Sequence, residues 1–299
     1  MDPYSPLNVF LAVVKERSFT RAAEKLYRTQ PAISLAIQRL ENELGERLLD
    51  RSGRDLALTE AGKLVYDCAR RQENLQRELS SQLSELRNKA IGRLVIGANE
   101  SMTHYLLPHL CSYRHLYPKI KLVVQRSRST ELPDHLAAGD VDFGILSYSP
   151  DDERFEATPL YIDHLSFVLP PNHRLAERKT VPIKELGMET FVAHNVMSPY
   201  RETVIREFQR QKVTLNMDIE MPTVESVRLM VQAGQGVAFL PRMCVDQDLR
   251  QGLLKEVQVK ELKLERTIYL VRVAKRALSH AGKAFLDMLH AQKKEKTKK

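Results

Sequence analysis

The composition of this chain lacks the features of a disulfide-rich or zinc-binding protein. Its 299 residues include no tryptophan, only 6% aromatic residues and only three cysteines. Cys68, Cys111 and Cys244 lie far apart and match neither a metal-ligand spacing nor a disulfide framework. A redox-sensing pair of Cys111 and Cys244 stays a minor alternative, because a free cysteine more often acts as a small buried hydrophobe.

Long apolar runs and catalytic motifs are also missing. No run approaches the ~18 residues of a membrane span, and the N-terminus, MDPYSPLNVF, lacks the layout of a signal peptide. We therefore expect a cytoplasmic protein with no membrane partner. No zinc-type histidine pair, nucleophile–base pair or glycine-rich phosphate loop is found, since AGQGVAF (233–239) opens a strand and not a helix. We expect no enzyme, no metal and no cofactor.

The residues that are present indicate a folded, basic, multidomain protein. A hydrophobic fraction of 43% suffices for real cores, and 299 residues predict two or three domains. The net charge of +8 permits binding to a polyanion such as nucleic acid. The tail QKKEKTKK (292–299) supplies part of that charge, so charge alone does not identify the partner.

Residues 18–49 predict two short helices separated by a tight break. The first is expected over about residues 20–26, with Thr20 in the N-cap position and small apolar residues on its inner face. Residues 27–28 form the break. This spacing is typical of a helix-turn-helix.

The second helix of the pair is expected to begin at a cap, Thr29, with Pro31 in its first turn, where a missing N–H costs little. One face carries an apolar stripe: Ile33, Ile37, Leu40 and Leu44. The opposite face carries mostly amides and hydroxyls: Gln30, Ser34, Leu35, Gln38 and Asn42. Such side chains can read base edges in the major groove, with Gln pairing best to adenine. A solvated hairpin of an unrelated α-domain would show a similar pattern.

Longer matches around this pair resemble the LysR-type transcriptional regulators, bacterial proteins with an N-terminal winged helix-turn-helix. The matching segments are FLAVVKERSFTRAAEKL (10–26), QPAIS (30–34), RLENELGERLLDR (39–51), LTEAG (58–62), LLP (106–108), AAGDVDFGI (137–145) and VQAGQGVAFLP (231–241). The residues that this resemblance and the helix pattern place on DNA are Thr20, Arg21, Thr29, Gln30, Pro31, Ser34, Leu35, Gln38, Arg39, Arg51 and Arg54. The family often has Arg where this chain has Leu35, so a polar contact is lost there or replaced by contact with a thymine methyl.

The flanks of the helix pair complete a small head. An opening helix over residues 5–17 is expected to pack behind the pair. In DRSGRDLALT (50–59), Arg51 and Arg54 flank a glycine in a tight turn between two extended pieces, which is the expected wing. Its arginines can reach phosphates or the minor groove, although a solvated turn would look similar.

A long helix follows, capped by Thr59 and free of proline to about Lys89. Some 30 residues at 1.5 Å each make a rod of roughly 45 Å. An apolar seam runs close to heptad spacing: Val65, Cys68, Leu75, Leu79, Leu83 and Leu86. The remaining positions are mostly charged or amide, which favours a dimerisation helix over a core helix. A dimer would present two reading helices to an inverted repeat.

Beyond a hinge expected at Ile91–Gly92, strands alternate with helices. The expected strands are 93–98, 119–125, 141–146, 190–194, 215–220 and 236–241, and the helices are 102–116, 130–138, 199–211 and 223–233. This order predicts two similar α/β lobes with mostly parallel sheets. Two more strands, 164–173 and 266–273, are expected to cross between the lobes, and a last helix, 279–292, to cover the first. The LysR-type family has this arrangement, akin to periplasmic solute-binding proteins.

A cleft between such lobes is the expected effector site, because ligands bind beside strand ends and helix N-termini in open α/β sheets. The candidate effector-binding residues are Asn99, Ser101, Met102, Arg128, Ser129, Ser147, Ser198 and Thr223. Taken singly, each Ser or Thr is better explained as a helix cap than as a ligand contact, so the prediction rests on their convergence on one cleft. Glu100 is a complication, since a carboxylate there would repel an anion unless Arg128 offsets it.

The sequence thus predicts an α/β protein of three parts. These are a winged helix-turn-helix (1–58), a linker and dimerisation helix (59–90), and an effector-binding domain (91–299). Lobe I covers about 91–163 and 268–299, and lobe II about 164–267. The resemblance implies a regulator that binds inverted-repeat double-stranded DNA as a homodimer or homotetramer, answers to a small-molecule effector, and has RNA polymerase as a partner. An enzyme built on the lobes and a nucleoid-like architectural protein are the alternatives, the latter with uniform, salt-sensitive DNA binding.

Overall fold

A computed structural model describes residues 5–50, 56–87 and 92–297. The chain divides into two compact units, which are described separately. The first comprises residues 1–92 and 137–140, and the second comprises 93–136 and 141–299. No helix among the described residues is both long and apolar enough to cross a membrane.

The first unit begins with a three-helix head followed by a two-stranded ribbon. Its elements are α1 (Pro6–Glu16), α2 (Phe19–Lys25), α3 (Gln30–Leu44), β1 (Leu49–Asp50) and β2 (Ala57–Leu58). The helices pack around one core that includes Phe10, Ala22 and Ile37, each fully buried. Gly45 ends α3 with φ 71°, a left-handed conformation that glycine adopts at little cost.

The observed head corrects three details of the predicted helix pair. The N-cap of α2 is Ser18 and not Thr20: the Ser18 hydroxyl accepts a hydrogen bond from the Arg21 N–H at 3.3 Å. Thr29 does occupy the N-cap position of α3, but its side chain makes no capping hydrogen bond. Leu44 is 46% exposed, so the buried stripe of α3 ends at Leu40.

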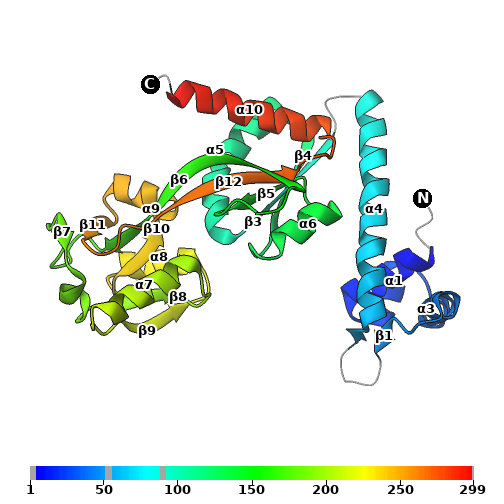
Figure 1. Cartoon of the computed structure of the whole chain (residues 1–299), viewed down its shortest axis with the longest axis horizontal. Coiled ribbons are helices and arrows are strands. Elements are labelled where there is room, and N and C mark those ends of the chain that lie inside the picture. The colour runs from blue at the N-terminus through cyan, green and yellow to red at the C-terminus, as the bar shows by residue number, and fades with distance from the viewer. Residues whose placement is uncertain (1–4, 51–55, 88–91, 298–299) are drawn as a thin grey trace. The chain divides into compact units, whose positions relative to one another are not determined.

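The long helix α4 (Glu60–Arg87) agrees with the prediction in length and cap. The Thr59 hydroxyl accepts a hydrogen bond from the Gly62 N–H at 2.9 Å. Gly62 lies against the backbone of Leu48, where an added Cβ would come within 2.0 Å of the Leu48 carbonyl oxygen. Only glycine therefore lets the first turn of α4 approach the head so closely. In Figure 1, α1 and α3 lie at the end where α4 begins.

The second unit consists of two α/β lobes. Lobe I contains β3 (Gly92–Ala98), α5 (Glu100–Leu116), β4 (Ile120–Arg126), α6 (Leu132–Ala138), β5 (Phe143–Leu146) and α10 (His280–Thr297). Lobe II contains β7 (Thr180–Val181), the 3-10 turn η1 (Ile183–Leu186), β8 (Thr190–His194), α7 (Pro199–Arg210), β9 (Asn216–Met221), α8 (Val224–Gln232), β10 (Ala238–Pro241), α9 (Arg242–Gln251) and β11 (Lys255–Val259). The crossovers are β6 (Phe155–Leu169) and β12 (Glu265–Val273).

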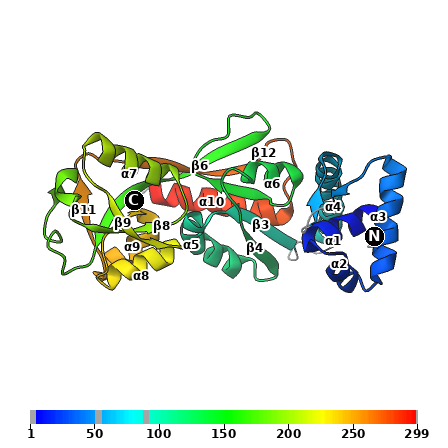
Figure 2. The same cartoon turned by 90° about the horizontal axis from the view of Figure 1, so that it is seen from below.

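Two crossing strands join the lobes. β6 and β12 pair in antiparallel fashion from Glu265 opposite His164 to Val273 opposite Phe155. Figure 1 shows them side by side as one long arch between the lobes, and Figure 2 shows α10 lying along lobe I. The sheet order is β4-β3-β5-β12-β6-β11-β7, with β10 also paired to β6.

The sheet is more mixed than the alternating pattern predicted. β3 pairs with β5 and β8 with β9 in parallel, as expected. β12 runs antiparallel to both β5 and β6, and β10 and β11 run antiparallel to β6. The prediction also missed α9, β11 and the first half of β6. Gly92 begins strand β3, and the boundary between the two compact units falls directly after it; Ile91 lies outside the described residues.

Each lobe has an aromatic core of its own. In lobe I, the Phe285 ring packs edge-on against Tyr113 at 5.4 Å between centroids, and both side chains are fully buried. In lobe II, Phe191 stacks on Phe239 at 5.6 Å and meets Phe208 edge-on. The two lobes therefore have separate cores, and the paired strands β6 and β12 run between them.

Candidate nucleic-acid interface and effector cleft

The outer face of α3 carries the side chains that sequence reasoning assigned to base reading. Gln30, Gln38 and Arg39 are exposed, and Ser34 is partly exposed. Leu35 stands among them at 47% exposure. Ile33, Ile37 and Leu40 hold the opposite face in the head core. Burial of the apolar stripe thus fixes which residues of α3 point outward, and those residues carry amides and a hydroxyl suited to base edges.

The remaining candidate DNA-contacting residues lie around α2, in the turn before α3, in the first turn of α3 and on the expected wing. Thr20, Thr29 and Pro31 are exposed. Arg21 is also exposed, but its guanidinium donates to the Glu16 carbonyl at the end of α1, so it already ties α2 to the preceding turn. Arg51 and Arg54 lie outside the described residues.

Tyr27, in the turn between α2 and α3, is a surface feature that sequence reasoning treated only as a helix break. Its φ is 53°, and its side chain is 92% exposed. A non-glycine residue in this left-handed region is uncommon. The turn therefore exposes the Tyr27 side chain shortly before α3 begins.

In lobe I, on the side of the expected effector cleft, the segments that follow three strands converge. The Asn99 side chain caps α5 by accepting from the Met102 N–H at 3.0 Å. Its amide nitrogen also donates to the Ser129 hydroxyl at 3.3 Å. The Tyr148 hydroxyl, two residues beyond β5, donates to the Ser129 carbonyl at 3.0 Å. The residues that follow β3, β4 and β5 are therefore linked into one network, as the sheet topology predicted.

Lobe II contacts lobe I beside this network, at the N-terminus of α8. The Thr223 hydroxyl caps α8 by accepting from the Ser226 N–H at 3.0 Å. The first N–H of the helix, that of Val224, donates to Oε1 of Glu100 at 2.8 Å. The other carboxylate oxygen of Glu100 is buried and has no hydrogen-bond partner among the described residues. A lobe I carboxylate thus lies at a helix N-terminus of lobe II.

Four of the predicted effector residues do not join this network. The Met102 side chain is fully buried in the core of lobe I, so packing accounts for it. Arg128 pairs with Glu131 at 3.3 Å and is 83% exposed, so it does not neutralise Glu100 as anticipated. Ser198 caps α7 by accepting from the Arg201 N–H at 3.2 Å. Ser147 follows β5 and is partly buried.

Ser101 reaches lobe II through its backbone. The Cys244 thiol of α9 donates to the Ser101 carbonyl at 3.9 Å. Burial raises the pKa of this thiol to about 12, and the negative charges of Asp163 and Glu100 act in the same direction. The thiolate needed for redox chemistry is therefore scarce at neutral pH.

The second member of the suggested redox pair is remote. Cys111 is exposed on α5, ten residues beyond Ser101, and ten helical residues span about 15 Å. A disulfide requires Cα atoms within roughly 7 Å. The structure does not bring Cys111 and Cys244 together.

Asp163, on β6, is a buried carboxylate that sequence reasoning missed. It is fully buried; its Oδ1 accepts from the Met243 N–H in the first turn of α9 at 3.2 Å. Its Oδ2 accepts from the Arg266 guanidinium of β12 at 3.0 Å, and that guanidinium lies over the Tyr200 ring at 4.4 Å. No local motif marks Asp163, because its partners lie 80 and 103 residues away.

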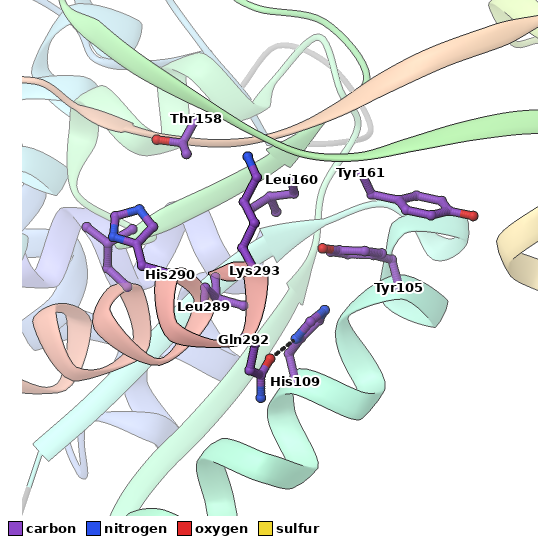
Figure 3. Close-up of a pocket in the computed structure, with 10 residues that line it drawn as sticks. Tyr105, His109, Thr158, Leu160, Tyr161, Leu289, His290, Gln292 and Lys293 are labelled. Atoms are coloured by element: carbon purple, nitrogen blue, oxygen red, sulfur yellow. Dashed lines mark hydrogen bonds between the residues drawn. The ribbon is translucent and has the colours of Figure 1, made fainter. Parts of the chain in front are cut away.

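A separate pocket of about 190 Å³ lies in lobe I between α5, β6 and α10 (Figure 3). Its lining residues are Tyr105, His109, Thr158, Leu160, Tyr161, Leu286, Leu289, His290, Gln292 and Lys293. Tyr105 stacks on Tyr161 at 5.4 Å, and burial raises its pKa to about 12, so its hydroxyl stays protonated. His109 Nδ1 lies 2.6 Å from Gln292 Oε1. None of the predicted effector residues lines this pocket.

Comparison with known proteins identifies the class of molecule that combines such a head with such lobes. Residues 5–63 match the family model of the bacterial regulatory helix-turn-helix protein, lysR family. Residues 87–294, more than half of the chain, match the LysR substrate binding domain. The chain belongs to the LysR family of DNA-binding transcriptional regulators.

The relatives in sequence share one description. A "Probable RuBisCO transcriptional regulator" of Cyanophora paradoxa is 31% identical over 291 residues, covering 94% of this chain and 89% of the relative. A protein of the same description from Cyanidioschyzon merolae is 30% identical over 290 residues, covering 95% and 96%.

Solved structures agree in fold. CbnR, a LysR family transcriptional regulator, superposes with a TM-score of 0.70 at 18% identity, covering 96% of this chain and 97% of CbnR. CbnR in complex with its target DNA gives 0.70 at 18% identity, covering 96% and 98%. The Synechocystis CcmR regulatory domain in complex with 2-PG gives 0.58 at 22% identity, covering 67% and 96%.

Proposed function

We propose that this regulator reads an inverted-repeat DNA site with α3 of paired heads, and that a small-molecule effector in the cleft between the lobes adjusts how the heads are held. The observation that carries the proposal is the outward face of α3, whose amides and hydroxyl are presented by a fully buried stripe. CbnR, which shares the fold, has been solved with its target DNA.

Pairing of the heads rests on α4. Leu64, Leu75, Leu79 and Leu83 are each at least half exposed along this helix. Exposed leucines in a row are costly in water and indicate a surface that another copy covers. A homodimer through α4, extended to a homotetramer, would place two or more reading helices on one duplex. The protein would act in the cytoplasm beside RNA polymerase and without catalysis.

The effector proposal rests on the network of Asn99, Ser129 and Tyr148 opposite the N-terminus of α8. Hydroxyls and helix N–H groups on two lobes can hold a small polar molecule, and binding shifts the balance of lobe arrangements. CcmR, with the same fold in its regulatory domain, has been solved with 2-PG.

The test is selection of binding sites from random duplexes with the full-length protein, followed by footprinting. We expect protection of an inverted repeat whose half-sites are separated by whole helical turns. Uniform coating of mixed-sequence DNA would instead support the architectural alternative. For the effector cleft, the test is a thermal-shift screen of small metabolites. A metabolite that raises the melting temperature of the wild type should not raise that of Ser129→Phe, and this variant should still bind DNA.

A further inference from the structure

Two carboxylates from outside the helices of lobe II, Asp163 and Glu100, accept hydrogen bonds from backbone N–H groups at helix N-termini of that lobe, and they differ in one respect. Asp163 bonds the first turn of α9 and is also paired with the Arg266 guanidinium. Glu100 bonds the first N–H of α8, yet within the described part of the chain its second oxygen is buried without a hydrogen-bond partner. A buried charge that lacks a cation is held less firmly than a paired one.

The position of Glu100 is one that favours a negative charge. The first N–H groups of a helix have no acceptor within the helix, and the helix dipole adds to their attraction for anions. The Glu100 side chain reaches this position from the start of α5, so its hydrogen bond to Val224 joins lobe I to lobe II. Arg128, which pairs with Glu131 instead, does not compensate it.

We propose that Glu100 is an internal competitor for the anion position of the effector cleft. Its carboxylate fills the place at the N-terminus of α8 that a carboxylate or phosphate group of a ligand would take, and holds the lobes together when that ligand is absent. An anionic effector binds α8 only by displacing Glu100 and thereby breaks this link between the lobes. This inference rests on the proposed effector cleft and specifies how that cleft is regulated.

Acetate and the full-length protein provide the test. In Glu100→Ala, the Val224 amide loses the carboxylate that accepts its hydrogen bond, so its hydrogen exchange should accelerate about tenfold or more. Sodium acetate should restore the protection in this variant, since acetate supplies the missing carboxylate, whereas sodium chloride at equal ionic strength should not. At the concentration that restores protection in the variant, acetate should leave the wild-type exchange unchanged, because Glu100 already occupies the position.

Two further variants keep the test decisive. Glu100→Gln preserves side-chain shape, so it should fold if Glu100→Ala does not, and it should bind acetate at about tenfold lower concentration than the wild type. Glu131→Gln is the matched control: it removes the charge of a neighbouring lobe I carboxylate that pairs with Arg128, and it should change neither quantity.

The contrary outcomes are equally defined. Unchanged Val224 exchange in Glu100→Ala would overturn the link between the lobes. Glu100→Gln can keep that hydrogen bond through its amide oxygen, so in this variant the deciding result is acetate affinity: binding no tighter than in the wild type would overturn the anion position. Loss of protection in Glu100→Ala without rescue by acetate would overturn it as well. Footprinting stays a separate measurement: a specific footprint with a failed acetate rescue refutes only this inference, while uniform coating of DNA refutes the proposed function.

Discussion

Helices α3 and α4 of the first unit each carry an apolar stripe, but they differ in what covers it. The stripe of α3 is buried in the head, with Ile37 fully inaccessible. The stripe of α4 is open, with Leu75 at 68% and Leu79 at 55% exposure. In α3, burial of the apolar side therefore fixes the direction in which the polar side points. Helix α4 leaves its apolar side exposed, and under the proposed function this side is the surface that a second copy covers.

The comparison predicts that the buried stripe of α3 has the largest single-residue effect. Ile37→Ala should lower the free energy of unfolding of the head by about 2–5 kcal/mol, because it removes transfer energy and leaves a cavity. Hydrogen exchange of the buried amides in α1–α3 measures this change. Leu35→Ala, on the exposed face of the same helix, is the control and should stay within about 0.5 kcal/mol. Equal costs at the two positions would mean that the outer face is covered.

The exposed stripe of α4 predicts a loss of assembly with the fold retained. Leu75→Ala with Leu79→Ala removes apolar contact at four places in a dimer and should weaken association by about 3 kcal/mol, roughly a hundredfold in Kd. Sedimentation equilibrium measures this Kd, with Arg71→Ala on the same helix as the control. Unchanged association would show that α4 does not form the contact between copies.

The same contrast explains what could be predicted from the sequence. Periodicity located α1, α3, α4 and most strands, because burial of one face repeats at a fixed local spacing. It failed where the partner is distant: β6 was predicted only from residue 164, since its first half is held by β12, a hundred residues away in the chain. Leu44 was predicted as buried because a stripe does not reveal where the core ends.

The residues of the candidate site also fall into those that local spacing predicts and those that depend on a distant partner. The outward residues of α3 follow from the helical repeat, so the pattern Gln30, Ser34, Gln38 could be predicted. The convergence of Asn99 with Ser129 followed from the rule that parallel strands end at one edge. The bond between Glu100 and Val224 spans 124 residues, and no sequence rule gives the separation of two lobes.

The outward face of α3 predicts an effect on DNA recognition without an effect on folding. Gln30→Ala or Ser34→Ala should weaken binding to the selected site by about 1–3 kcal/mol, because each removes a group able to bond a base edge. Binding to unrelated duplexes should stay the same, since that depends on phosphate contacts. Fluorescence anisotropy on both duplexes measures the difference. An equal loss on both would identify these residues as backbone contacts.

The smallest effect concerns the two caps of the helix pair, which the sequence presents as similar and the structure separates. Ser18 bonds the Arg21 N–H, so Ser18→Ala should lower the stability of the head by about 1 kcal/mol. Thr29 makes no capping bond with its side chain, so Thr29→Ala should change that stability by less than about 0.5 kcal/mol. Hydrogen exchange of the head amides measures both. Because Thr29→Ala spares the fold, any DNA affinity that it loses reports a contact made by the hydroxyl, whereas a destabilised head in this variant would mean that Thr29 serves as a cap after all.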